Sequence, residues 1–96
     1  MELWIRSQDK MNLVKVRQIS VNYQDNKQII ANYMPELYEN SGAYYELLGT
    51  YKTKERAIEV LDEIQEAKLG NFHYRCPSNV KISSKEDTII YQMPKD

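Results

Sequence analysis

The segment from Thr53 to Leu69 constrains the fold of this chain more than any other part of the sequence. Apolar residues recur in it at three- and four-residue spacing, which is the period of one face of an α-helix. These residues are Ala57, Val60, Leu61, Ile64 and Ala67, with Ile58 beside them. Thr53 is a suitable N-cap, and Gly70 followed by Asn71 favours an end to the helix. The sequence therefore predicts one amphipathic helix whose apolar face packs against another layer.

The opposite side of this helix is acidic. It presents Glu55, Glu59, Asp62 and Glu66 at helical spacing. A row of exposed carboxylates repels phosphate, so this helix is not predicted to bind nucleic acid. Such a row can instead occupy a basic groove of another protein through charge complementarity.

The first half of the chain has the alternation and the turn residues of β-strands. Strands are predicted over Leu3 to Arg6, Leu13 to Tyr23, Lys27 to Tyr33 and Ala43 to Tyr51, joined as an antiparallel meander of about four strands. Within the second of these segments the apolar phase changes between Val16 and Ile19. A β-bulge near Arg17 and Gln18 is the favoured explanation, and burial of the strand on both faces is the alternative.

The segment after the helix contains shorter strand patterns. We expect a short strand over Phe72 to Arg75, a marginal one over Val80 to Ile82, a polar hinge at residues 83–88, and a final strand over Thr88 to Met93. Ile89 and Tyr91 share one face of the final strand. Pairing of this strand within its own sheet is favoured, and exchange with a neighbouring subunit is the alternative. Residues 1–96 are thus predicted to form a single α+β domain, with the helix packed on the sheet.

Charge and cysteine content limit the classes of function. The chain has 13 Lys and Arg against 14 Asp and Glu, a formal net charge of −1, which argues against binding to a nucleic-acid polymer or a membrane surface. Cys76 is the only cysteine, so no intrachain disulfide forms and a reducing cytosol fits. The first residues lack the basic start and the long apolar run of a signal peptide. We therefore expect a cytoplasmic protein.

No catalytic motif is present in the sequence. His73 and Cys76 are three residues apart, but two potential ligands are too few for a typical zinc site, and no further Cys or His exists. They would form a nucleophilic pair only if the turn between them brought them together. We expect a protein that is not an enzyme and that holds no metal and no cofactor.

Basic and aromatic residues suggest a binding site instead. Lys54 and Arg56 lie at the predicted helix start, where unpaired N–H groups and the positive dipole end favour anions. Arg6 and Arg17 offer planar guanidinium groups for phosphate oxygens. The predicted ligand-binding residues are Arg6, Arg17, Lys54 and Arg56 for phosphate, with Trp4 and Tyr91 for stacking on a base.

Most of the eight tyrosines are expected in the core or on the sheet surface, because strands favour aromatic residues. Whether Tyr44 and Tyr45 face the core or a pocket stays open at this stage. Solvated surface is the competing interpretation for the basic residues.

Three segments of the chain resemble a family of small uncharacterised proteins of phages and mobile elements of Gram-positive bacteria. They are LWIRSQDK at residues 3–10, LGTYKTKERA at 48–57 continuing through VLDEIQ at 60–65, and IYQMP at 90–94. Among phage proteins, this resemblance points to the anti-Thoeris sponge proteins, which capture a cyclic ADP-ribose-type immune signal. It implies an anti-defence protein of the host bacterial cytoplasm, an α+β homo-oligomer that binds a cyclic nucleotide between protomers without catalysis.

Two functions are consistent with these observations. The first is sequestration of a cyclic nucleotide by the basic and aromatic residues, with a dimer or higher oligomer supplying the burial that a small domain lacks. The second is inhibition of a host defence enzyme or complex through the acidic face of the helix.

Overall fold

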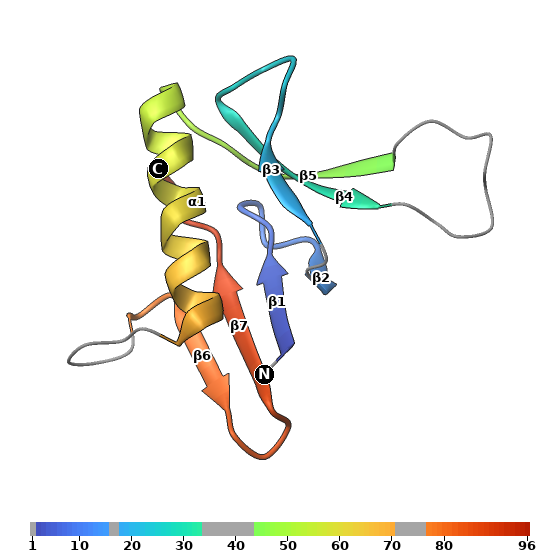
Figure 1. Cartoon of the computed structure of the whole chain (residues 1–96), viewed down its shortest axis with the longest axis vertical. Helices are drawn as coiled ribbons and strands as arrows, with labels where there is room; N and C mark the ends of the chain where they lie inside the picture. Colours follow the sequence, from blue (N-terminus) through green and yellow to red (C-terminus); the bar gives the residue numbers. More distant parts are fainter. Residues whose placement is uncertain (1, 16–17, 34–43, 71–76) are drawn as a thin grey trace.

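The computed structural model describes residues 2–15, 18–33, 44–70 and 77–96. It contains one helix and seven strands in these ranges. They are β1 (Glu2–Arg6), β2 (Leu13–Lys15), β3 (Ile19–Val21), β4 (Gln28–Tyr33), β5 (Tyr44–Thr50), α1 (Lys54–Leu69), β6 (Val80–Ser83) and β7 (Thr88–Gln92). The helix lies along one side of the strands (Figure 1), which confirms the predicted α+β class.

The predicted helix is confirmed at both ends. The Thr53 hydroxyl accepts a hydrogen bond from the backbone N–H of Arg56 at 3.0 Å, as an N-cap does. Gly70 has φ 70° and its N–H bonds back to Ala67, the left-handed C-cap that glycine adopts without strain. Ala57, Val60, Ile64 and Ala67 are buried, and the four predicted acidic residues on the other side are exposed.

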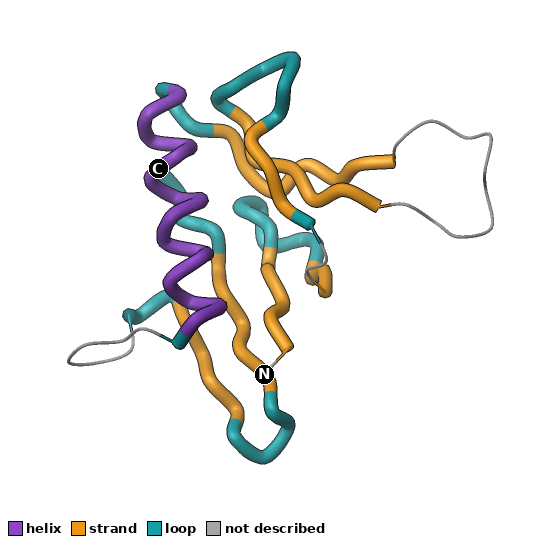
Figure 2. Tube along the Cα trace, in the orientation of Figure 1, coloured by secondary structure: helices purple, strands orange, loops and turns teal. Residues whose placement is uncertain are grey.

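The strands divide between two sheets instead of forming one continuous meander (Figure 2). The first sheet has the order β2-β1-β7-β6, and the second has the order β3-β4-β5. The segment from Leu13 to Val21 begins as β2 beside β1 and continues as β3 beside β4. Val14 and the pair Ile19 and Val21, on either side of the change of apolar phase, therefore belong to different sheets. The predicted bulge at Arg17 lies outside the described residues. Among the paired strands, the register shift lies between β4 and β5, at Ile29 and Ile30.

The last strand pairs within its own sheet, as favoured. β7 runs parallel to β1 and antiparallel to β6, so it is an inner strand of the first sheet. The preceding polar hinge forms a turn, in which the Glu86 N–H bonds the Ser83 hydroxyl at 3.3 Å and the Thr88 hydroxyl bonds the Glu86 carbonyl at 2.9 Å. The predicted strand over Phe72 to Arg75 lies outside the described residues.

One apolar core joins α1 to both sheets. Its members from the strands and their ends are Leu3, Ile5, Val14, Ile29, Ala31, Leu48, Tyr51, Val80, Ile89, Tyr91 and Met93. They meet the buried face of α1, and Ile19 and Val21 pack against them. Because α1 covers one face of the first sheet, the other face of that sheet is left for a different role.

Candidate functional site

Alternation along β1 separates core residues from surface residues. Leu3 and Ile5 are buried in the core, whereas Trp4 and Arg6 point to the opposite face. We call this opposite face, turned away from α1, the outer face of the first sheet. Two of the six predicted site residues, Trp4 and Arg6, lie on it.

The register places a row of four side chains straight across the outer face. Lys15 on β2 is opposite Trp4 on β1, Trp4 is opposite Ile90 on β7, and Ile90 is opposite Lys81 on β6. Neighbouring strands are about 4.8 Å apart, so the backbones of the two lysines are roughly 14 Å apart. An aromatic ring and an apolar side chain thus lie between two cations.

A hollow of about 460 Å³ opens beside this row. We call it the outer hollow, and its lining residues are Arg6, Lys10, Ser78, Asn79, Lys81, Ile90 and Gln92. Three of these residues are cations and none is a carboxylate. The lining thus combines positive charge with amide and hydroxyl groups, the set that binds an anion with attached hydroxyls.

The cations of the outer hollow have no acidic partner among the described residues. Nε of Arg6 donates to the Lys10 carbonyl at 3.1 Å, a bond that orients the guanidinium without neutralising it. Within residues 2–15, 18–33, 44–70 and 77–96, no salt bridge to Arg6, Lys10 or Lys81 is present. Their charge is therefore available to a ligand.

A tightly bonded loop presents Lys10. Ser7 is buried, and its hydroxyl donates to Oδ1 of Asp9 at 2.5 Å and accepts from the Asn12 N–H at 3.1 Å. The Met11 N–H also donates to Asp9 Oδ1, and these donors, Ser7 first, hold the pKa of Asp9 below its ordinary value. Lys10 itself has φ 67°, a left-handed backbone conformation that residues with a Cβ atom rarely adopt. Backbone strain of this kind is often found at functional sites.

Lys15 differs from the other cations of the outer face because it is paired. Its Nζ is 3.0 Å from Oε1 of Glu2, whose other oxygen accepts from the Trp4 indole at 3.4 Å. Lys15 lowers the pKa of Glu2 through this hydrogen bond and through its charge. Glu2 thereby holds both Lys15 and the edge of the Trp4 ring in place.

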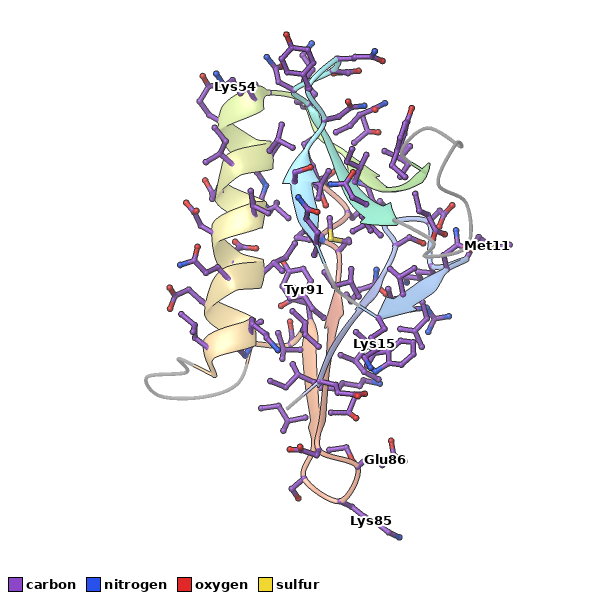
Figure 3. The ribbon with its side chains drawn as sticks, turned by 45° about the vertical axis from the view of Figure 1, so that its right-hand side comes forward. Met11, Lys15, Lys54, Lys85, Glu86 and Tyr91 are labelled. Atoms are coloured by element: carbon purple, nitrogen blue, oxygen red, sulfur yellow. The ribbon has the colours of Figure 1, made fainter. Side chains whose placement is uncertain are left out.

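Lys54 and Arg56 are not brought to this site. Arg56 lies on the acidic side of α1, where NH1 contacts Glu59 and is 3.6 Å from Glu63, and Nε donates to the Asp96 carbonyl at 2.9 Å. Its guanidinium also lies 5.9 Å from the centre of the Tyr51 ring. Lys54 is exposed at the first turn of α1, away from Lys15 (Figure 3). The predicted anion site at the helix start is thus replaced by an internal charge network around Arg56.

Tyr91 lies in the core, which corrects its predicted role in stacking on a ligand. It is 1% exposed and lies between the first sheet and α1, whereas Lys15 is on the other side of the sheet (Figure 3). Its hydroxyl donates to Oε2 of Glu63 at 3.0 Å, and burial, reinforced by that carboxylate, raises the pKa of Tyr91. The shared parity of Ile89 and Tyr91 was the sequence signal for this placement.

Five further residues from the sequence analysis have no or only a partial structural answer. Arg17, His73 and Cys76 lie outside the described residues. Tyr45 is exposed on β5, and nothing is described for the Tyr44 side chain. The residues missed by sequence reasoning are Lys10, Ser78, Asn79, Lys81 and Gln92. Lys10 is placed by the local loop after β1, whereas the other four reach the outer hollow because β6 and β7 lie beside β1.

A second hollow of about 380 Å³ lies between α1 and β6. Its lining includes Glu59, Asp62, Glu63 and Glu66 above a floor formed by Ala67, Pro77, Val80 and Tyr91. The molecule therefore has a cationic hollow on one side of the first sheet and an anionic one on the other. The formal net charge of −1 gives no indication of this separation of charge.

Comparison of the chain with protein-family models, with curated proteins and with solved structures found no match. Across the described ranges, no helix has the length and apolar character needed to cross a bilayer. In the same ranges, no group of three or more His, Cys, Asp or Glu is placed to hold a metal ion. The feature of the described residues that bears on function is therefore the outer face, with its cationic hollow.

Proposed function

We propose that this protein binds and sequesters a phosphate-bearing nucleotide of the cyclic ADP-ribose type in the outer hollow, without catalysis. The single observation that supports this proposal most strongly is the set of Arg6, Lys10 and Lys81 around one hollow, with no acidic partner for any of them among the described residues. Such a protein would act as an anti-defence factor in the cytoplasm of a bacterial host, as the resemblance to phage proteins implies.

The charge of the outer hollow matches a diphosphate. Two phosphate groups bring two negative charges when each is singly ionised, and three cations surround the hollow. Arg6 can form two parallel hydrogen bonds to phosphate oxygens, and each lysine adds a mobile point charge. The NH₂ groups of Asn79 and Gln92 donate to backbone carbonyls, which orients their amide oxygens as acceptors for hydroxyls on the ligand.

Trp4 supplies a stacking surface next to these charges. Its indole is partly exposed on the outer face, two residues along β1 from Arg6 and opposite Ile90, which lines the hollow. A base stacked on an aromatic side chain contributes about 1–3 kcal/mol. The size of the hollow, about 460 Å³, lies within the usual range for small-molecule sites.

A homo-oligomer completes this proposal. The outer hollow lies on the face of a sheet, so a ligand bound there keeps one side in water. A second copy placed over the outer face would bury that side and slow release of the ligand. The predicted dimer or higher oligomer therefore remains part of the proposal.

A depletion assay with one matched pair of variants tests the proposal. The protein is incubated with cyclic ADP-ribose, ADP-ribose and related cyclic nucleotides, removed by ultrafiltration, and heated to release what it holds. We expect depletion of a panel member and its return unchanged. Arg6→Gln should weaken capture about tenfold to a hundredfold, because a charge-assisted hydrogen bond contributes about 1.5–3 kcal/mol.

Arg56→Gln is the control, because it removes the same guanidinium from the other side of the molecule, where Glu59 and Glu63 already occupy it. This variant should keep full capture and lose some thermal stability. Absence of depletion with every panel member, or equal loss of capture in both variants, would contradict the proposal.

A second candidate function rests on the acidic side of α1. The exposed Glu59, Asp62 and Glu66 line the anionic hollow and could dock on a basic groove of a host defence enzyme. Reversal of these three residues to Lys would abolish inhibition by docking. The same reversal should leave nucleotide capture in the outer hollow intact, so it separates the two functions.

A further inference from the structure

The outer hollow has a neighbouring hollow of about 520 Å³. We call this neighbour the tail hollow, and its lining residues are Gln8, Asp9, Lys10, Asn79, Gln92, Met93, Pro94 and Lys95. Lys10, Asn79 and Gln92 line both hollows, so the two hollows lie next to each other with Lys10 between them. A ligand longer than a nucleoside diphosphate can therefore extend from one hollow into the other.

The wall of the tail hollow is fixed by Gln8. Its side-chain amide donates to the carbonyls of Lys95 at 2.7 Å and Pro94 at 3.2 Å, and its oxygen accepts from the Thr50 N–H at 2.9 Å. Tyr51 adds a hydrogen bond from its hydroxyl to the Pro94 carbonyl at 3.0 Å. These bonds hold residues 94–95 against the loop that contains Asp9, so the shape of this hollow exists before a ligand binds.

The chemistry of the tail hollow differs from that of the outer hollow. It contains one carboxylate, Asp9, and the apolar ring of the partly exposed Pro94. Ser7 and Met11 both donate to Oδ1 of Asp9, whereas no other residue of the described ranges donates to Oδ2. A carboxylate oxygen accepts hydrogen bonds from sugar hydroxyls, as an acidic residue does with ribose in dinucleotide-binding folds.

We infer that the tail hollow binds a second sugar, attached to the diphosphate held in the outer hollow, and that Asp9 accepts a hydrogen bond from a hydroxyl of that sugar. This inference rests on the proposed function and narrows its ligand class to nucleoside diphosphate sugars. Lys10 contacts the diphosphate at the junction of the two hollows. Pro94, which is partly exposed, lies against the apolar face of the sugar ring.

Calorimetric titration with three ligands tests this inference. The ligands are ADP, ADP-ribose and the ADP-ribose analogue whose distal sugar is 2-deoxyribose. The wild-type protein should bind ADP-ribose at least tenfold more tightly than ADP. If Asp9 contacts the 2-hydroxyl of the distal sugar, the 2-deoxy analogue should lose most of this difference in affinity. A fourth ligand, the 3-deoxy analogue, tests the neighbouring hydroxyl in the same way.

Asp9→Asn provides the protein-side measurement. The amide oxygen of Asn can still accept the bonds from Ser7 and Met11, so the loop keeps its anchor while the second acceptor is lost. We expect this variant to bind ADP-ribose about tenfold to a hundredfold more weakly and to bind ADP as the wild type does.

The outcomes distinguish the inference from the proposal on which it rests. Cyclic ADP-ribose is titrated beside these ligands. If it, ADP and ADP-ribose all fail to bind, the proposed function itself is wrong. If cyclic ADP-ribose binds and ADP-ribose does not, the inference about the tail hollow is wrong. If ADP binds, and ADP-ribose and both deoxy analogues bind with the same affinity as ADP, the outer hollow holds a nucleotide and the inference about the tail hollow is wrong. An equal loss of affinity for ADP and ADP-ribose in Asp9→Asn would also overturn it.

Discussion

Arg6 and Arg56 are chemically identical and lie on opposite sides of the first sheet, yet only one of them is available to a ligand. Arg56 is surrounded by Glu59, Glu63 and the Asp96 carbonyl. The Arg6 guanidinium donates to the Lys10 carbonyl and, in the part of the chain that the structure describes, lines a hollow without carboxylates. Whether a cation is available to a ligand therefore depends on the acidic groups that the fold places beside it.

Trp4 and Tyr91 show the same difference between a residue that is open to a ligand and one that is held within the fold. The two lie on neighbouring strands, at positions of opposite parity, because the partner of Tyr91 on β1 is Ile5. Tyr91 therefore lies with the core and Trp4 with the outer face. A one-residue difference in phase separates a structural ring from a ring that can contact a ligand.

The largest expected effect compares the two faces of the first sheet directly. Ile5 on β1 is 0% exposed in the core, whereas Ile90 on β7 is partly exposed on the outer face. Ile5→Ala should lower the free energy of unfolding by about 2–5 kcal/mol, because it leaves a cavity against α1. Ile90→Ala should lower it by about 1 kcal/mol, because less apolar surface is buried there.

Urea denaturation of the two variants measures both values. Equal losses would mean that the outer face is as tightly covered as the inner one, which would argue against an open binding surface. In the same variants, nucleotide capture should fall only for Ile90→Ala, since Ile90 lines the outer hollow and Ile5 does not.

The sequence pattern predicted the helix and most strands because their signals are local. The period of Ala57, Val60 and Ile64, and the caps at Thr53 and Gly70, depend on residues within a few positions of one another. The parity of Trp4 and Arg6 likewise placed both residues on one face.

The rest of the site depends on distant pairings. β1 lies beside β7, so Arg6 is next to Gln92, and Lys81 reaches the outer hollow only because β6 follows β7 in the sheet. No local pattern encodes a parallel pairing between the two ends of the chain. The partners of Arg56 could be predicted only in part. Glu59 is three residues away in the sequence, whereas the Asp96 carbonyl is 40 residues away.

A smaller effect is expected at Lys10, where stability and binding should change in opposite directions. The left-handed backbone at φ 67° costs a residue with a Cβ about 1–2 kcal/mol, and glycine avoids this cost but loses more chain entropy on folding. Lys10→Gly should therefore raise the free energy of unfolding by up to about 1 kcal/mol and weaken nucleotide capture about tenfold.

Lys10→Ala is the matched control for this change. It removes the same charge but keeps the strained backbone, so it should weaken capture equally without any gain in stability. Thermal denaturation of both variants measures the change in stability, and the depletion assay measures the change in nucleotide capture. A loss of stability in Lys10→Gly, or full capture in Lys10→Ala, would contradict the role assigned to Lys10.

The smallest expected effect concerns acid stability, and it separates the two carboxylates that support the outer face. The folded pKa of Asp9 is lowered from an ordinary value of 3.8, chiefly by the Ser7 hydroxyl and then by the Met11 N–H. A lowered pKa means that the ionised group stabilises the folded state above pH 3.8, and that this stabilisation is lost as the pH falls through the folded pKa. In urea denaturation, Asp9→Asn should be less stable than the wild type at pH 6, and the two should converge as the pH falls below 3.8 and through the folded pKa of Asp9.

Salt then distinguishes Asp9 from Glu2. The pKa of Glu2 is also lowered, but its largest causes are the hydrogen bond and the charge of Lys15, a surface ion pair that salt screens. The donors to Asp9 are neutral, so salt should leave most of its effect in place. We expect the stability difference between wild type and Glu2→Gln at pH 6 to shrink when NaCl is raised from about 0.05 to 1 M, at which the Debye length is about 3 Å. The difference for Asp9→Asn should persist, and a parallel decrease in both would mean that Asp9 is held by charge, which would contradict the neutral hydrogen bonds that define its loop.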